Sequence, residues 1–361
     1  WALFSAMLLT SWFAWDFAAE ARPYIFSLLF ATAQTLLAAR AAQDLAARKR
    51  LRPGFFVSAG LLSLAASYTH YFGFLLSGGF FAALLALAVT NRRWRDAQGL
   101  FATGVAVAAV TGVWLAISLT ALQGQEGGGF WNQKSLVATM AEFFGTAFSV
   151  NLPLVGAVAI AAVMAVNALW RDPAARTVAI MGAVCFAAAL VLSLATPLIY
   201  YRYLIVLAPV LFYLSAWALD RAAKPWLTAV AVVAMLSVSL PLSIARSLEP
   251  REEWREAAAY FDARWGEVCE GATVMVLPDY FDNMPQRYSG HKYYLPDADI
   301  NFVPFAEERL SAAYLNQACP VILWAGHLPT RAFLRLADEL ALTDAETIAG
   351  RFERAHFLVQ D

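Results

Sequence analysis

The chain of 361 residues is 60% hydrophobic and only 15% charged, whereas about a quarter of the residues in soluble domains are charged. This composition excludes an ordinary soluble globule and predicts a membrane protein. The net charge of −1 hides an asymmetry: residues 1–245 hold fifteen Lys and Arg against eight Asp and Glu, and the remainder hold eleven against nineteen. A basic nucleic-acid-binding face, and hence a nucleic-acid partner, is not expected.

About 20 apolar residues are needed for a helix to cross the hydrocarbon core of a bilayer. This criterion predicts nine spans, at 1–17, 23–43, 54–72, 74–90, 98–120, 152–170, 177–196, 203–219 and 225–245. The chain opens at Trp1 inside an apolar run, so we expect a truncated first span and a missing N-terminal part. The predicted domains are a transmembrane bundle over 1–245 and a soluble domain over 246–361.

The loops between the predicted spans differ in their content of basic residues. One alternate set holds twelve Lys and Arg, and the other set holds three. Because cytoplasmic loops carry the excess of Lys and Arg, the first set is predicted to face the cytoplasm and the domain after residue 245 the opposite side. Arg22 and Arg202 are therefore anomalies on the outer side, where arginine is uncommon.

The outer segment 123–151 is longer than a turn. A glycine triplet at 127–129 precedes Phe130 and Trp131, which is typical either of a loop that lies on the membrane surface or of an ordinary connector. The triplet lacks the Lys and Ser or Thr that complete a phosphate-binding loop.

The residues after 251 have the pattern of a small α/β domain. Periodicity predicts helices at 252–265, 304–316 and 330–340, buried strands at 273–277 and 321–324, and two strands near the end. This order predicts a mixed sheet covered by helices. Cys269 and Cys319 form either a disulfide or two buried thiols. Cys185 is expected to pack within a span, and the three cysteines do not have the spacing of a zinc site.

Polar groups at the predicted outer ends of spans are the first candidates for function. The run W-D-F-A-A-E-A-R-P-Y contains Glu20, Arg22 and Tyr24. Pro23 suits the first turn of a helix, so Arg22 would lie at the positive end of that helix and form an anion site. The alternative is an interfacial salt bridge that holds the hairpin together.

Two further clusters are predicted at the same side of the membrane. Tyr68 and His70 belong to the run Y-T-H-Y, which is also typical of an aromatic interfacial belt. Tyr201 and Arg202 belong to T-P-L-I-Y-Y-R-Y, where arginine can bind phosphate through its planar fork or merely snorkel to the interface. Together, the three clusters suit an anionic lipid head group.

As a set, E-A-R-P-Y, Y-T-H-Y and Y-R-Y-L resemble motifs of the bacterial dolichyl-phosphate-mannose protein mannosyltransferase-like group of GT-C membrane glycosyltransferases. The resemblance covers most of residues 1–245. It implies transfer of a sugar from a polyprenyl-phosphate-linked donor to a lipid, glycan or protein acceptor, at the extracytoplasmic face of a bacterial plasma (inner) membrane. The family's catalytic carboxylate lies in the first outer loop, so we expect it upstream of Trp1.

By position, Glu20 and Arg22 match the family's outer-loop pair, and Arg202 matches the arginine near the lipid phosphate. Our leading hypothesis is that Arg22 and Arg202 bind the phosphate and that Glu20 orients Arg22. Tyr68, His70 and Tyr201 would line the sugar or phosphate pocket, and Tyr24 is assigned to the same binding site. No definite cofactor is predicted, and assistance by a divalent metal is an open alternative.

Two other functions are alternatives. A non-catalytic transporter or scaffold for lipid-linked sugars would use the same arginines, but a transporter should have discontinuous helices and midplane charges, whereas every predicted span has an apolar midplane. A membrane-anchored binding domain would place the function in the α/β domain, with Asp279, Asp282 and His291 as its candidate site.

Overall fold

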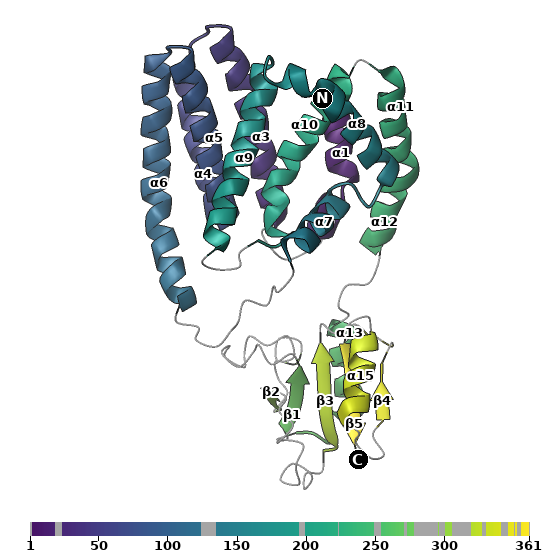
Figure 1. Cartoon of the computed structure of the whole chain (residues 1–361). Helices are drawn as coiled ribbons and strands as arrows, with labels where there is room; N and C mark the ends of the chain where they lie inside the picture. The colour runs from purple at the N-terminus through teal and green to yellow at the C-terminus, as the bar shows by residue number, and fades with distance from the viewer. Residues whose placement is uncertain are drawn as a thin grey trace. The chain divides into compact units, whose positions relative to one another are not determined.

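The computed structural model describes residues 2–18, 24–123, 135–194, 199–222, 224–248, 254–270, 273–277, 295, 300–304, 319–326, 330–340, 346–349, 351 and 355–360. The chain divides into two compact units, Trp1–Leu248 and Glu249–Asp361. The first unit is helical, and the second contains a five-stranded sheet (Figure 1).

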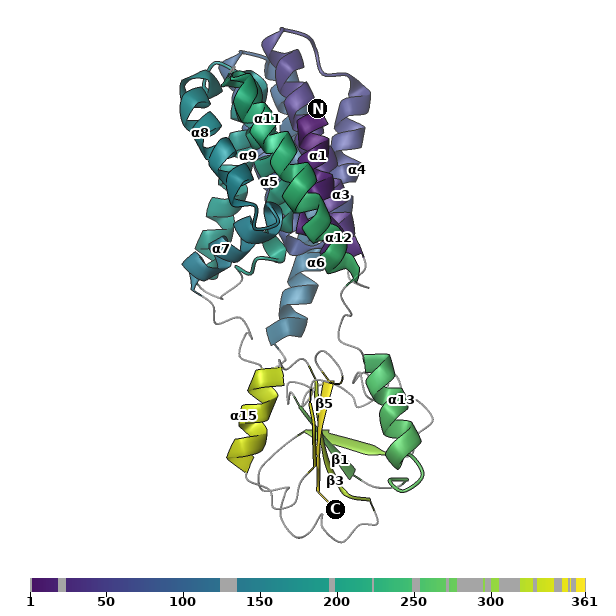
Figure 2. The same cartoon turned by 90° about the vertical axis from the view of Figure 1, so that its right-hand side faces the viewer.

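The first unit is a bundle whose long helices run alternately in opposite directions (Figures 1 and 2). Its α-helices are α1 (Ala2–Thr10), α2 (Trp12–Ala18), α3 (Tyr24–Ala46), α4 (Pro53–Thr69), α5 (Tyr71–Thr90), α6 (Trp94–Gln123), α7 (Leu136–Ala147), α8 (Leu152–Leu169), α9 (Pro173–Ser193), α10 (Ala208–Arg221), α11 (Pro225–Ala234) and α12 (Leu240–Leu248). A 3₁₀ turn (Tyr203–Leu207) leads into α10, and a π-helical segment (Met235–Ser239) joins α11 to α12.

Within the described part of the chain, seven helical segments are long and apolar enough to cross a membrane. The prediction of a multi-pass helical membrane protein is confirmed at this level, but the count of nine spans is not. Ser11 divides the predicted span 1–17 into α1 and α2, and α4 has only 17 residues. The predicted boundary near residue 73 was wrong, because His70 has an extended backbone (φ −161°, ψ 140°) that ends α4 and starts α5.

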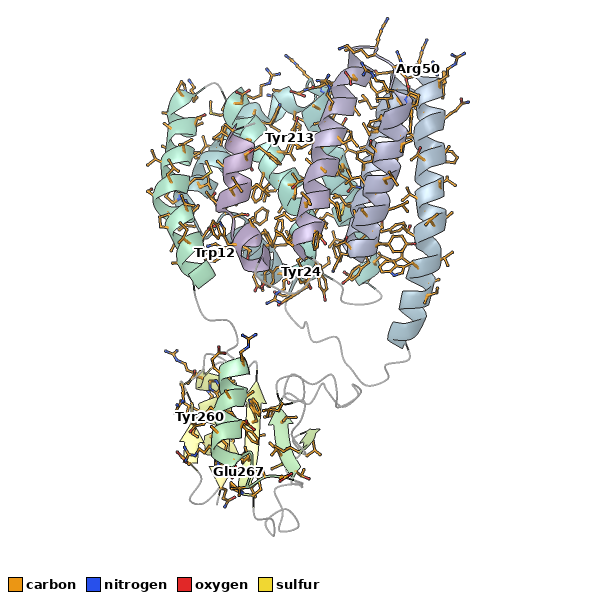
Figure 3. All side chains as sticks on the ribbon, turned by 180° about the vertical axis from the view of Figure 1, so that it is seen from behind. Trp12, Tyr24, Arg50, Tyr213, Tyr260 and Glu267 are labelled. Carbon is orange, nitrogen blue, oxygen red and sulfur yellow. A yellow bond between two sulfur atoms is a disulfide. The ribbon has the colours of Figure 1, made fainter. Side chains whose placement is uncertain are left out.

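The described residues next to the predicted inner loops and those next to the predicted outer loops lie at opposite ends of the bundle. Figure 3 shows Arg50 at one end and Tyr24 at the other. At the Arg50 end, Asp172 caps α9 and accepts a hydrogen bond of 2.9 Å from the Trp217 indole. Burial alone would raise the pKa of Asp172, but the bonds from Trp217 and from two backbone amides lower it. The Asp172 side chain therefore stays charged.

Three irregular segments meet at one buried place in the bundle. They are the break between α1 and α2, the turn between α7 and α8, and the π-helical segment. The Ser149 hydroxyl, on a residue with φ of 51°, donates to the Thr10 carbonyl over 2.7 Å. Asn151 donates from Nδ2 to the Ala234 carbonyl (2.7 Å) and to the Ser239 hydroxyl (2.9 Å). These polar contacts join segments far apart in the sequence.

Replacing Asn151 by alanine is expected to destabilise the bundle by about 2–4 kcal/mol. The substitution removes the hydrogen bond that the Leu154 amide donates to Asn151 Oδ1 at the start of α8. It also removes the two bonds that Asn151 donates to Ala234 and Ser239. Thermal unfolding of the full chain in detergent measures the effect. Asn167→Ala, on the exposed face of the same helix, should change stability by less than about 0.5 kcal/mol. Equal midpoints for the two variants would contradict this account of the turn.

The second unit has one sheet with the strand order β2-β1-β3-β5-β4. Its strands are β1 (Thr273–Leu277), β2 (Asn301–Pro304), β3 (Val321–Gly326), β4 (Glu346–Ile348) and β5 (Ala355–Gln360). β1 is parallel to β2 and β3, whereas β5 is antiparallel to β3 and β4. The predicted mixed sheet is confirmed.

Helices α13 (Trp254–Trp265) and α15 (Thr330–Leu340) cover opposite faces of the sheet (Figure 2). On the α13 face, Phe261 stacks on Trp324 with ring centroids 5.3 Å apart. On the α15 face, Phe333 packs with Met275 and Leu358. Alternate residues of the strands thus supply two separate cores, as expected from the period of two in a strand.

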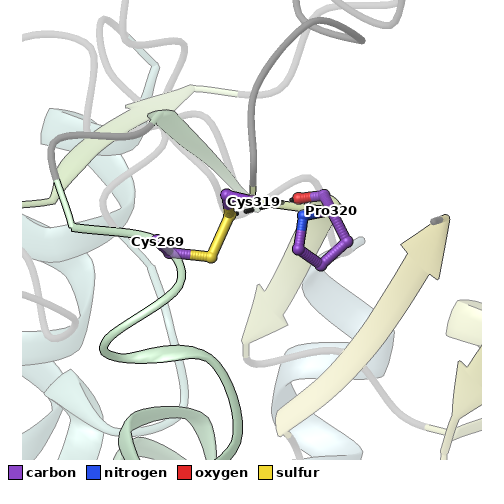
Figure 4. The surroundings of a disulfide bond; sticks show 3 residues. All are labelled: Cys269, Cys319 and Pro320. Carbon is purple, nitrogen blue, oxygen red and sulfur yellow. Dashed lines mark hydrogen bonds between the residues drawn. A yellow bond between two sulfur atoms is a disulfide. The ribbon is translucent and has the colours of Figure 1, made fainter.

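Cys269 and Cys319 form a disulfide (Figure 4), which decides between the two predicted alternatives. Cys185 is a buried thiol in α9, as predicted. Most of the predicted helix 304–316 falls outside the described residues, and so do Asp279, Asp282 and His291. Strand β2 was not predicted.

Candidate functional site

A compact group of rings lies at the end of the bundle opposite Arg50. We call it the tyrosine–histidine cluster, and it consists of Tyr24, His70, Tyr71, Phe72 and Tyr203. The centroid of the His70 ring is 5.8 Å from that of Tyr24, 4.3 Å from that of Tyr71 and 4.9 Å from that of Tyr203. The cluster therefore joins the start of α3, the α4–α5 junction and the 3₁₀ turn before α10.

His70 is held in place by the sharp connection between α4 and α5. Its Nδ1 accepts a hydrogen bond of 3.2 Å from the Phe72 amide and so caps α5. With Nδ1 as the acceptor, the neutral imidazole carries its proton on Nε2, which makes that atom a hydrogen-bond donor. Gly73 permits the connection, because a Cβ there would overlap the carbonyl oxygen of Ala66 on α4.

The N-termini of three helical segments converge on this cluster. α3 begins at Tyr24, α5 at Tyr71, and the 3₁₀ turn that leads into α10 at Tyr203. Ring contacts of 6.5 Å between Tyr24 and Tyr203 and of 5.5 Å between Tyr71 and Tyr203 place the three ends side by side. Each helix N-terminus carries a partial positive charge, although the Phe72 amide already bonds His70 Nδ1 and the Tyr203 amide bonds the Tyr200 carbonyl over 2.9 Å. The converging helix dipoles favour an anion.

Arg202 adds a full positive charge beside the cluster. Its Nε donates to the Tyr201 hydroxyl over 3.0 Å, and its guanidinium carbon lies 6.0 Å from the Tyr200 ring centroid and 5.7 Å from that of Tyr201. These contacts are within the range of cation–π attraction. Tyr200 in turn lies 5.7 Å from Tyr203, which connects the arginine with the cluster.

Tyr200 and Glu142 add further polar groups at this end of the bundle. Burial raises the pKa of Tyr200 to about 12, Tyr201 and Glu142 act in the same direction, and Arg202 opposes them. Tyr200 therefore keeps its proton at neutral pH and is a hydrogen-bond donor. Glu142 is half-buried on α7, and the sequence reasoning missed it. The available signal was its position as the single carboxylate in the apolar segment 136–147.

The structure brings together four of the seven predicted site residues, namely Tyr24, His70, Tyr201 and Arg202. Tyr68 lies apart from the cluster, since its hydroxyl donates to the Val110 carbonyl over 3.4 Å and its ring centroid is 5.5 Å from that of Trp114 on α6. Tyr68 belongs to α4, whereas His70 is the extended residue that ends this helix, so the two side chains diverge. Glu20 and Arg22 lie outside the described residues.

Tyr71, Phe72 and Tyr203 complete the cluster, although the sequence reasoning did not select them. Within the described ranges there is no group of three His, Cys, Asp or Glu side chains that could hold a metal ion. Comparisons of the chain with protein-family models, curated proteins and solved structures found no match.

Proposed function

We propose that the tyrosine–histidine cluster and Arg202 bind the phosphate of a polyprenyl-phosphate-linked sugar, and that the protein is a membrane glycosyltransferase. The observation that carries the proposal is the convergence of three helix N-termini beside an arginine. The positive ends of helix dipoles attract a phosphate, and the guanidinium fork matches its oxygens. The acceptor would be a lipid, glycan or protein.

An apolar groove near the cluster supports a lipid as the donor. It lies between α5 and α6, has a volume of about 250 Å³ and is lined by residues that include Phe74, Phe81, Leu100 and Val107. Phe74 is three residues, or nearly one helical turn, from Tyr71. A polyprenyl chain in this groove would place its phosphate at the level of the cluster.

The chemistry of the transfer requires groups that accept charge on the leaving phosphate. As the bond between sugar and phosphate breaks, negative charge grows on the phosphate, and donors already in place stabilise it. Arg202, the Tyr200 hydroxyl and His70 Nε2–H are the donors that we assign. The acceptor hydroxyl needs a general base, for which the GT-C resemblance implies a carboxylate in the family's first outer loop.

We assign the cluster end of the bundle to the extracytoplasmic side of a bacterial plasma membrane. The excess of Lys and Arg in the loops of the opposite end supports this orientation. The disulfide between Cys269 and Cys319 supports an extracytoplasmic second unit, because disulfides persist in oxidising compartments.

A transporter of lipid-linked sugars is the second candidate, and specific observations favour it. The α1–α2 break at Ser11 and the π-helical segment 235–239 are discontinuities in membrane helices, which transporters often place near their substrate sites. Gln34 is moreover a buried polar residue in the middle of α3, where the sequence analysis expected an apolar midplane.

One assay separates the two candidates. The full-length protein is placed in proteoliposomes with a polyprenyl-phosphate sugar labelled in both the lipid and the sugar, together with envelope lipids and glycans as acceptors. A transferase should release free polyprenyl phosphate and label an acceptor in equal amounts. Movement of intact donor to the other leaflet indicates a transporter, and absence of both activities would reject both candidates.

A further inference from the structure

One buried amide connects α3, α4 and α5, whose ends meet at the cluster. Gln34 on α3 has an exposed fraction of 0%. Its Nε2 donates to the Ser63 hydroxyl on α4 over 3.0 Å and to the Ser77 hydroxyl on α5 over 2.8 Å. Both serines are buried as well. We call these three residues the Gln34 clamp.

The clamp lies at a defined distance from His70. Ser63 precedes His70 by seven residues and Ser77 follows it by seven, which corresponds to about 10 Å along each helix. The amide therefore holds both arms of the α4–α5 hairpin at the same level below its tip. Because α3 begins at Tyr24, the clamp connects the helix that carries Tyr24 with the hairpin whose tip carries His70, Tyr71 and Phe72.

The stability of the bundle does not explain this amide. The Oε1 atom of Gln34 is buried and has no hydrogen-bond partner within the described part of the chain. An unsatisfied buried carbonyl destabilises by about 1–3 kcal/mol, whereas a hydrogen bond between membrane helices contributes about 0.6 kcal/mol on average. Two such bonds do not offset the unsatisfied atom. Their remaining effect is geometric, since they restrict sliding of otherwise apolar helices.

We propose that Gln34 is a positioning residue, which sets the height of His70 relative to Tyr24 and Tyr203 and so shapes the anion site. The consequence for ligand binding rests on the proposed function, but the consequence for the geometry of the cluster does not. At Gly73, α5 packs closely against Ala66 of α4. Because the helices are in contact there, a movement of either helix also moves His70.

The test uses the full chain in lipid nanodiscs with 3-fluorotyrosine in place of Tyr203. The ring centroids of Tyr203 and His70 are 4.9 Å apart. Gln34→Met removes both donors and the unsatisfied acceptor at similar volume. We expect the ¹⁹F resonance of residue 203 to shift or broaden and the affinity for a polyprenyl phosphate to fall about tenfold. The thermal midpoint should stay equal or rise.

Ser67→Ala is the matched control. Ser67 is a buried serine on α4, one turn from Ser63, and its hydroxyl donates within its own helix to the Ser63 carbonyl over 2.7 Å. This variant should leave the resonance and the affinity unchanged, whereas Ser63→Ala and Ser77→Ala should each give part of the Gln34→Met shift.

A Gln34→Met protein that melts at a lower temperature with an unchanged ¹⁹F resonance would overturn the proposal, because Gln34 would then serve packing alone. If the unsubstituted chain binds no polyprenyl phosphate, the proposed function fails. In that case the ¹⁹F resonance still decides the positioning role: a shift in Gln34→Met but not in Ser67→Ala supports it, and no shift overturns it.

Discussion

Replacing Arg202 by glutamine is expected to slow sugar transfer by the full-length protein by about 10²–10³-fold. The guanidinium lies beside three helix N-termini and is oriented by its bond of 3.0 Å to the Tyr201 hydroxyl. Glutamine removes the charge that would stabilise the leaving phosphate. The rate with a saturating polyprenyl-phosphate sugar measures the loss, and protein yield and thermal midpoint show whether the fold is retained.

Two further variants define what Arg202 contributes. Arg202→Lys keeps the charge but loses the planar fork, so its activity should lie between those of the unsubstituted and glutamine proteins. Arg221→Gln alters an exposed arginine of α10 at the opposite end of the bundle, beside Asp172, and should leave transfer unchanged. Full activity in Arg202→Gln would show that the phosphate binds elsewhere.

Arg22→Ala is also predicted to nearly abolish transfer.

The second large effect concerns the disulfide of the second unit. Changing both Cys269 and Cys319 to serine should destabilise this unit by about 4 kcal/mol, because the bond closes a loop with a sequence separation of 50 residues and restricts the unfolded chain. Proteolysis of the full chain in increasing urea measures the midpoint for loss of the second unit. Addition of a reductant to the unsubstituted chain should reproduce the effect.

Cys185→Ala provides the control for the double substitution. It removes the buried thiol of α9 and leaves the disulfide intact, so the urea midpoint of the second unit should not change. If the double serine variant and the reduced chain both keep the original midpoint, the disulfide does not stabilise the unit.

Features that depend on local composition could be predicted from the sequence. The helix at 330–340 and the strand at 273–277 have the predicted bounds, because periodicity reports the buried face of each element directly. The α4–α5 boundary could not be located in this way. Apolar residues continue on both sides of His70, and the helix ends there through a backbone conformation that hydropathy does not reveal.

The candidate site was predicted only in part, because its geometry is non-local. Tyr24, His70 and Arg202 were selected as costly polar groups at span ends, but their proximity depends on packing of α3, α5 and the turn before α10. Tyr203 was passed over although it contacts more members of the cluster than Tyr201. Tyr68 was selected from the same motif as His70, but α4 ends between them and the extended backbone of His70 turns its side chain to the cluster.

The central claim is that an anionic lipid head group binds at the tyrosine–histidine cluster. A polyprenyl phosphate with a photoreactive group next to its phosphate, bound to the full chain in nanodiscs and mapped by mass spectrometry, tests it directly. We expect labelled peptides that contain residues 68–72 and 200–203, with labelling reduced in Arg202→Gln. Labelling confined to the basic loops around Arg50 and Arg93, at the opposite end of the bundle, would contradict it.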